Sequence, residues 1–124
     1  PRAGAVYVFH KTRDKAGRDR WRQTARLAAP RPQDHALFGS SLSLKGTRLL
    51  VGAPGETVQG QSNAGAVHVF EEGRNGRWRQ RSRLTLHAPM QEDRLGVAVA
   101  WAGGLAAGGA YLRDQPGGRE ADTG

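Results

Sequence analysis

The sequence repeats itself at a spacing of 57 to 61 residues, and this repetition limits the folds open to it more than any other feature. Residues 4–9, Gly-Ala-Val-Tyr-Val-Phe, return 61 positions later as Gly-Ala-Val-His-Val-Phe at 65–70. Residues 21–23, Trp-Arg-Gln, return 57 positions later at 78–80. A regular period of this size is typical of architectures that stack one small supersecondary unit. We therefore expect successive copies of one unit.

The centre of the unit, residues 38–54, reads as two short strands around a tight turn. Phe38, Ser40, Leu42 and Leu44 share one face at the period of a strand, and Lys-Gly-Thr at 45–47 supplies the turn. The apolar run at 49–51 is typical of a strand covered on both faces, and Gly-Ala-Pro at 52–54 ends it. A weaker copy, with Gly103-Gly104 as its turn, occupies residues 95–110.

The flanking strands carry a tryptophan in each copy. From Trp21 onward, Gln23, Ala25 and Leu27 are predicted to share its face. Because Trp21 and Trp78 are at equivalent positions, we expect both to be packed, whereas Trp101 aligns with Leu44 and is open to either core or surface. Arginines 79, 81 and 83 are predicted to share one water-facing side of their strand.

These motifs resemble the FG-GAP repeat, which builds the β-propeller of integrin α-chains and of many bacterial surface and secreted proteins. The resemblance rests on Phe38-Gly39, Gly-Ala-Pro at 52–54 and the segment 65–70, in that order. The second copy departs from it with Leu95-Gly96 and with Gly-Ala-Tyr at 109–111. The resemblance implies an all-β propeller and an extracellular, cell-surface or periplasmic location.

The order of strands predicts a division of the 124 residues within one propeller domain. We expect residues 1–33 to be the outer two strands of one blade, 34–90 one complete blade of four antiparallel strands, and 91–124 the inner two strands of the next. Two blades' worth of strands cannot close a ring, since propellers have about four to eight blades. The first residue is Pro1 and no signal-peptide pattern is present, so a processed chain or a fragment is expected.

Composition narrows the classes of function. No cysteine is present, so disulfides and thiolate metal sites are excluded. No apolar run approaches the roughly 20 residues of a membrane span. The net charge of +8 comes mainly from arginines spread over both copies without aromatic stacking platforms. This spread favours a general arginine bias over a surface for nucleic acid or another polyanion, which stays the alternative function.

Chemistry-bearing residues are scattered. The turns at 45–47 and 102–104 hold no carboxylate, so the calcium loop that the resemblance suggests is not carried over, and no cofactor is expected. The acidic residues near the end read as a solvated loop: Asp114, Glu120 and Asp122. Asp34 beside His35 is badly placed to orient it towards Ser40, because adjacent side chains of an extended segment diverge. We expect no enzyme.

The sequence therefore favours a non-enzymatic scaffold for protein–protein interaction or cell adhesion, with ligands contacted by inter-strand loops. The candidate loops span residues 31–35, 56–63, 91–94 and 112–123. Their candidate contact residues are Asp34, His35, Glu56, Gln59, Asp93, Arg94, Arg113 and Asp114. The expected partners are a protein of unknown identity, and either adjacent blades of a parent chain or further copies that complete the open sheet edges by head-to-tail strand exchange.

Overall fold

The computed structural model describes residues 3–102 and 104–110, and within these ranges the chain forms strands, turns and loops without any helix. The strands are β1 (Val6–Arg13), β2 (Asp19–Leu27), β3 (Ser41–Lys45), β4 (Arg48–Ala53), β5 (Ala66–Glu72), β6 (Trp78–Leu84), β7 (Val99–Ala102) and β8 (Leu105–Gly108). All are paired antiparallel, so the predicted all-β fold is confirmed. Over the same ranges nothing has the length and apolar character of a membrane-crossing helix.

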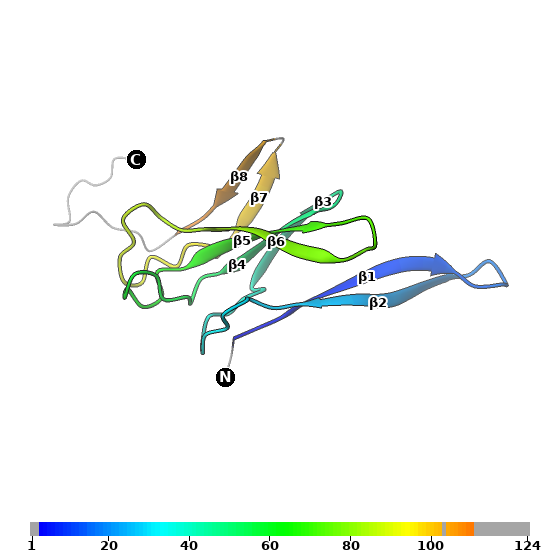
Figure 1. Ribbon diagram of the computed structural model, residues 1–124, viewed down its shortest axis with the longest axis horizontal. Helices are drawn as coiled ribbons and strands as arrows, with labels where there is room; N and C mark the ends of the chain where they lie inside the picture. Colours follow the sequence, from blue (N-terminus) through cyan, green and yellow to red (C-terminus); the bar gives the residue numbers. More distant parts are fainter. Residues whose placement is uncertain (1–2, 103, 111–124) are drawn as a thin grey trace.

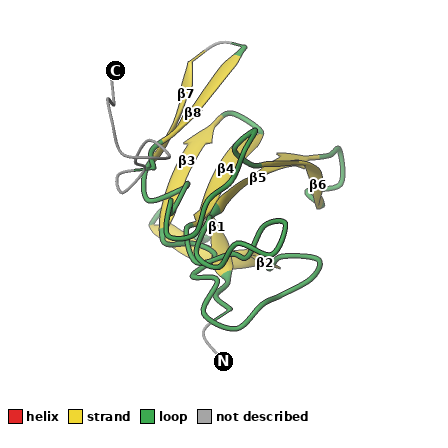
Figure 2. Ribbon diagram, turned by 90° about the vertical axis from the view of Figure 1, so that its left-hand side faces the viewer, coloured by secondary structure: helices red, strands yellow, loops and turns green. Residues whose placement is uncertain are grey.

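The strands form three sheets that follow one another along the chain. A two-stranded sheet β1–β2 precedes a four-stranded sheet in the order β3-β4-β5-β6, and a two-stranded sheet β7–β8 comes last. Figure 1 shows β1–β2 on one side of the four-stranded sheet and β7–β8 rising on the other, and the turned view in Figure 2 shows the same sequence of layers. The four-stranded sheet therefore lies between β1–β2 and β7–β8.

The two long hairpins repeat each other in register as well as in sequence. Val6 pairs with Leu27 in β1–β2, and Val67 pairs with Leu84 in β5–β6. The register shifts between Val8 and Phe9 in the first hairpin and at the equivalent place in the second. Such a bulge inserts one extra residue into one strand and turns the following side chains to the other face. The repeat is thus a repeat of backbone structure, including its irregularity.

The bulges overturn two predictions about sheet faces. Trp21 pairs with Lys11 beyond the bulge, so it lies on the face opposite to Leu27, and it is 67% exposed. The prediction that Trp21 is packed was wrong, although Trp78 is half-buried against the core. The second bulge separates the arginines in the same way. Arg83 pairs with His68 and Arg79 with Glu71, which are on opposite faces of β5, so the three arginines do not share a side.

Glycines lock each unit onto the next one. Gly4 and Gly65 have φ values of +94° and +88°, and a Cβ at either position would run into the backbone of Phe38 or Leu95, respectively. These backbones are held in place by equivalent hydrogen bonds, from Phe38 N to Ala3 O and from Leu95 N to Ala64 O, both 2.9 Å long. Only glycine combines this left-handed conformation with so close an approach.

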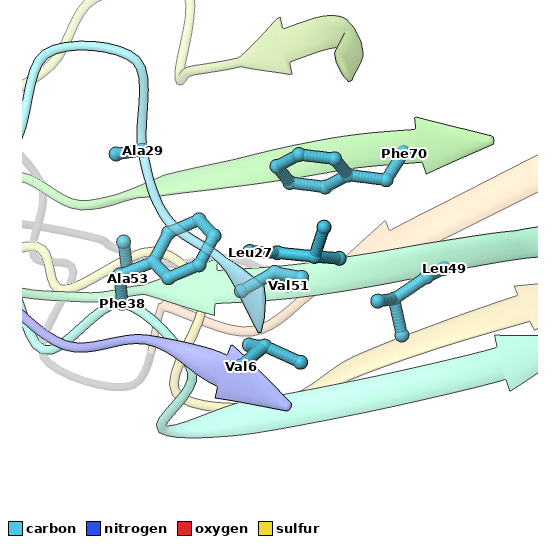
Figure 3. Packing of buried hydrophobic residues seen from close by; sticks show 8 residues of the cluster. All are labelled: Val6, Leu27, Ala29, Phe38, Leu49, Val51, Ala53 and Phe70. Carbon is cyan, nitrogen blue, oxygen red and sulfur yellow. The ribbon is translucent and has the colours of Figure 1, made fainter. Parts of the chain in front are cut away.

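One hydrophobic core lies between β1–β2 and the four-stranded sheet. It is made by Val6, Leu27, Ala29, Phe38, Leu49, Val51, Ala53 and Phe70. Figure 3 shows side chains from β1, β2, β4 and β5 meeting in this layer. The ring of Phe38 meets that of Phe70 edge-on, with centroids 6.0 Å apart, and so ties the turn before β3 to the sheet.

A second core lies on the other face of the sheet. Its buried members are Leu50, Val67 and Leu95, and Val69, Leu86, Val99, Trp101 and Ala110 pack against them. Because Leu49 and Val51 face the first core and Leu50 faces the second, β4 is buried on both sides, as its unbroken apolar run predicted. Trp101 is half-buried and packs against this second core.

The strand predicted to begin at Phe38 begins at Ser41 instead. Phe38 is buried within a turn, and Gly39 adopts a φ of +96° while its N donates a hydrogen bond to Gly52 O. A residue with that φ interrupts the alternation of a strand, so Phe38 lies before the strand. Its ring nevertheless joins the core on the face of β4 that carries Leu49 and Val51. Leu42 and Leu44 belong to the same face, because they pair with these two residues. Those two leucines are exposed.

Candidate binding surface at the loop end

Three loops come together at one end of the molecule, on the left of Figure 1. The loop before β3 is joined to the loop before β5 through Gln33, whose Oε1 accepts a hydrogen bond of 2.8 Å from Thr57 N and whose Nε2 donates to Thr57 O. The backbone adds a second link, from Gly55 N to Ala36 O at 2.9 Å. The first two loops therefore form one continuous structure.

The loop before β7 joins the same structure from the other side. Backbone hydrogen bonds run from Glu92 N to Ser62 O and from Arg94 N to Asn63 O. The side chain of Asn63 donates to Glu92 Oε2 at 2.8 Å, and Arg94 pairs with the other oxygen of Glu92 at 2.7 Å. Loops held to one another and to a rigid sheet in this way are typical positions for binding residues.

The backbone of these loops is unusually constrained. All six non-glycine residues with positive φ in the described ranges lie here: His35, Leu37, Gln59, Asn63, Glu92 and Arg94. Four of them recur at the repeat spacing of 57, His35 with Glu92 and Leu37 with Arg94, so they belong to the architecture of the repeat. Gln59 and Asn63 have no such counterpart among the residues that the structure describes, and they form tight turns of the loop before β5.

A buried ionic network supports the base of the loops. Glu56 and His68 are 2% and 1% exposed, and His68 Nε2 lies 2.5 Å from Glu56 Oε2. Arg83 of β6 contacts the other carboxylate oxygen of Glu56, through Nε at 2.9 Å and Nη2 at 2.8 Å. The ring of His68 also stacks edge-on against Phe38. The network thus connects the loop before β5 to strands β5 and β6.

Both nitrogens of His68 are engaged. Gln80 Nε2 lies 3.0 Å from His68 Nδ1 and also donates to Ser82 O, so each ring nitrogen of His68 has a polar neighbour. Burial alone raises the pKa of Glu56, but hydrogen bonds and charge from His68 and Arg83 outweigh it, so that the pKa lies below its ordinary value. Glu56 is therefore a carboxylate at neutral pH, and its oxygens are occupied.

A pocket of about 340 Å³ opens beside this network, between the segment that follows β2 and the face of β5–β6 that carries His68. It is lined by Ala29, Pro30, Arg31, Gln33, Glu56, His68, Gln80 and Arg83. Its polar lining consists of two guanidinium groups, two amides and the paired side chains of Glu56 and His68. Guanidinium and amide groups bind carboxylate and amide oxygens well. The pocket therefore suits a polar or acidic side chain of a partner better than an apolar one.

The sequence-predicted contact residues fall into three groups. Asp34, His35 and Gln59 are exposed on the joined loops, and Arg94 is half-buried beside them. Glu56 and Asp93 are buried, and the carboxylate of Asp93 accepts a hydrogen bond from Met90 N, so both stabilise loops instead of presenting a contact surface. Arg113, Asp114 and the rest of the loop at 112–123 lie outside the described residues.

Sequence reasoning missed the role of His68, Gln80 and Arg83. His68 stands where the other copy has Tyr7, and nothing in its neighbourhood along the chain points to Glu56, 12 residues away. The available signal was the repeat itself, because a histidine stands where the other copy has tyrosine and needs a polar partner when buried.

Comparison with known families decides what these sheets are. The model of the FG-GAP repeat family matches residues 21–70, which run from β2 to β5 and include the turn at Phe38-Gly39 and the Gly-Ala-Pro segment. Residues 21–70 are an FG-GAP repeat. Searches among curated proteins and among solved structures gave no match.

FG-GAP repeats form the blades of β-propellers, and the sheet β3–β6 has the four antiparallel strands of one such blade. The Phe-Gly pair of the repeat is the turn that Gly4 locks, and the Gly-Ala-Pro segment leads β4 into the joined loops. No group of three or more metal-binding side chains occurs in the part of the chain that the structure describes. The FG-GAP signature residues therefore shape the backbone around the joined loops.

Proposed function

We propose that this chain is a non-enzymatic binding scaffold, which contacts a protein ligand through the joined loops at one end of the blades. The observation that carries this proposal is the set of hydrogen bonds that unites three loops, through Gln33 and Thr57 on one side and Asn63 and Glu92 on the other. A surface preorganised in this way loses little conformational entropy on binding. The exposed residues Asp34, His35 and Gln59 lie on it.

The state of the ionisable groups supports binding over catalysis. A general base needs a lone pair directed at its substrate. In the network, His68 Nε2 and Arg83 contact the two oxygens of Glu56, and His68 Nδ1 faces Gln80. These groups are engaged in holding the loops, and the pocket beside them offers a place for one side chain of a ligand.

The proposal extends to architecture and location. We propose that residues 34–90 are one complete blade, that 1–33 supply the outer strands of the blade before it, and that 91–124 supply the inner strands of the blade after it. The arrangement of two, four and two strands in the described ranges supports this division. An extracellular, cell-surface or periplasmic location accords with FG-GAP propellers, where adhesion and recognition are the usual tasks.

A polyanion-binding function is less well supported. Arg83 is paired with buried Glu56, and Arg48 and Arg81 lie 3.7 and 3.6 Å from Glu71. Binding through phosphates requires a concentrated basic face whose affinity falls steeply with salt. The scaffold proposal predicts that affinity for double-stranded DNA is weak and does not depend on Arg79 or Arg81.

The experiment captures ligands from cell-surface and envelope fractions with the immobilised chain and then measures the affinity of a captured protein. The double variant Asp34→Ala with Gln59→Ala is expected to weaken that affinity at least about tenfold, a loss of roughly 1.4 kcal/mol. The control Lys15→Ala, an exposed residue on the turn between β1 and β2, is expected to leave it unchanged. Equal binding by all three proteins would contradict the proposal.

A further inference from the structure

Large hydrophobic side chains are exposed on particular sheet faces and almost nowhere else. In the described residues eight of them are exposed, and seven lie on strands: Tyr7, Phe9, Trp21, Leu42, Leu44, Leu84 and Leu105. The eighth, Leu37, is in the loop before β3. Exposed apolar groups that gather on sheet faces mark surfaces for packing against another element.

Within the chain, the equivalents of the exposed aromatic residues are covered. Tyr7 and Phe9 correspond to His68 and Phe70 at the spacing of 61, and both of the latter are buried under the core that Val6 and Leu27 bring from β1–β2. Trp21 corresponds to Trp78 at the spacing of 57, and Trp78 is packed against this core. The exposed face of β1–β2 is therefore equivalent to one face of β5–β6. In the chain, that face of β5–β6 is covered by β1–β2.

The exposed leucines of the inner strands follow the same rule. Leu42 and Leu44 correspond at the spacing of 57 to Val99 and Trp101, which pack on the four-stranded sheet through Leu50 and its neighbours. We call the uncovered surface made by Tyr7, Phe9, Trp21, Leu42 and Leu44 the leading face.

The chain also carries the surface that complements the leading face. Leu27 covers β5–β6 from one side, and its equivalent 57 residues later is Leu84, which is 39% exposed on the far side of the same strands. Leu105 is exposed on β8, beside the alanines of that hairpin. We call the surface made by Leu84 and Leu105 the trailing face.

We propose that the trailing face of one copy of this chain binds the leading face of a second copy, head to tail, and reproduces between chains the contact already made within the chain. In this arrangement β1 of the second copy lies beside β8. The pairing of Leu49 with Phe70 in β4–β5 then corresponds to Ala106 of one copy opposite Phe9 of the other. One interface thus covers the apolar faces and pairs β1 with β8, each of which has only one neighbouring strand within the described ranges.

A second copy is the occupant because the two faces complement each other and are carried by one chain. Such a contact is heterologous, so each copy keeps one unused face, and association continues until a ring closes. The interface does not involve Asp34, His35 or Gln59, so it stands or falls separately from ligand binding by the loops.

Sedimentation across about a hundredfold range of concentration tests this with matched variants. The wild-type chain is expected to rise in mass with concentration, and Leu84→Glu and Trp21→Glu each to weaken association at least about tenfold. Leu37→Glu is the control, because Leu37 is 40% exposed, nearly the same as Leu84, but lies outside both faces. Circular dichroism checks that every variant keeps its β structure. A wild-type chain that stays monomeric, or association unaffected by both face variants or equally weakened by Leu37→Glu, overturns the proposal.

Mixing the two face variants tests the head-to-tail geometry. Leu84→Glu keeps an intact leading face and Trp21→Glu an intact trailing face, so an equal mixture is expected to form a one-to-one dimer at concentrations at which each variant alone stays monomeric. A mixture that stays monomeric contradicts the head-to-tail arrangement, since only one intact interface is then required.

Discussion

Replacing Gly65 by alanine tests how one unit is fastened to the next. Gly65 has a φ of +88°, and a Cβ there would meet the backbone N and O of Leu95 and come within 2.8 Å of the carbonyl carbon of Arg94. Backbone atoms of a hydrogen-bonded segment cannot move aside as the end of a side chain can. Alanine at this position therefore adds a steric clash to an unfavourable conformation.

The two effects can be separated by Gly17→Ala. Gly17 has a similar φ of +79°, but nothing lies within 4 Å of its added Cβ. The control is expected to lose only the conformational term, about 1–2 kcal/mol of unfolding free energy. Gly65→Ala adds forced overpacking of about 1–3 kcal/mol, for a total of about 2–5 kcal/mol.

Urea denaturation followed by circular dichroism measures both losses, at a concentration low enough to keep the chain monomeric. The difference between the two variants is the quantity of interest, since the conformational term is common to both. Equal losses for Gly65→Ala and Gly17→Ala would refute the reasoning, because the close approach of Gly65 to Leu95 would then have no energetic weight.

Three further predictions concern the cores and the buried network. Leu50→Ala, which empties a fully buried site, should lower the unfolding free energy by about 2–5 kcal/mol, whereas Leu44→Ala at an exposed site should change it by less than about 1 kcal/mol in urea titrations of the monomer. Glu56→Gln should lower it by about 1.5–3 kcal/mol at neutral pH. The pKa of Glu56 in the folded protein is depressed below 4.5, so its stabilisation is present above that pH and is lost as the pH falls through the folded pKa. The unfolding free energy of the variant should therefore fall less steeply with pH in the acid range than that of the wild type. An unchanged fall speaks against the network. In dilute solution acrylamide should quench the fluorescence of Trp21 most strongly, so Trp21→Phe should remove most of the quenchable fluorescence. If Trp78→Phe removed most of it instead, the packing of Trp78 described above would be wrong.

The parts of the fold that were predictable from sequence are those in which residue type alone indicates burial, or in which a segment recurs. The apolar run at 49–51 has no polar side to expose, and β4 is accordingly buried on both faces. Sequence copies at spacings of 57 and 61 predicted equivalent hairpins, and these hairpins share a register. Both signals depend on many residues that agree, so single exceptions such as His68 do not remove them.

The parts that were not predictable depend on one residue or on distant contacts. A bulge moves Trp21 to the opposite face from Leu27, yet the extra residue, Thr24, fits regular alternation equally well. The candidate site needs Glu56, His68 and Arg83 together, and they come from a loop and two strands whose pairing alone brings them into reach. The joined loops likewise depend on backbone hydrogen bonds, which leave no mark on side-chain composition.

Successive repeat units pack face to face on both sides of the four-stranded sheet. Nuclear Overhauser contacts in the 124-residue chain, with methyl groups and aromatic rings labelled, test it most directly. We expect contacts from the methyl groups of Val6 or Leu27 to the rings of Phe38 or Phe70, and from those of Leu50, Val67 or Leu95 to the indole of Trp101. Contacts on one face only, or Trp101 with the spectrum of a free indole, would contradict it.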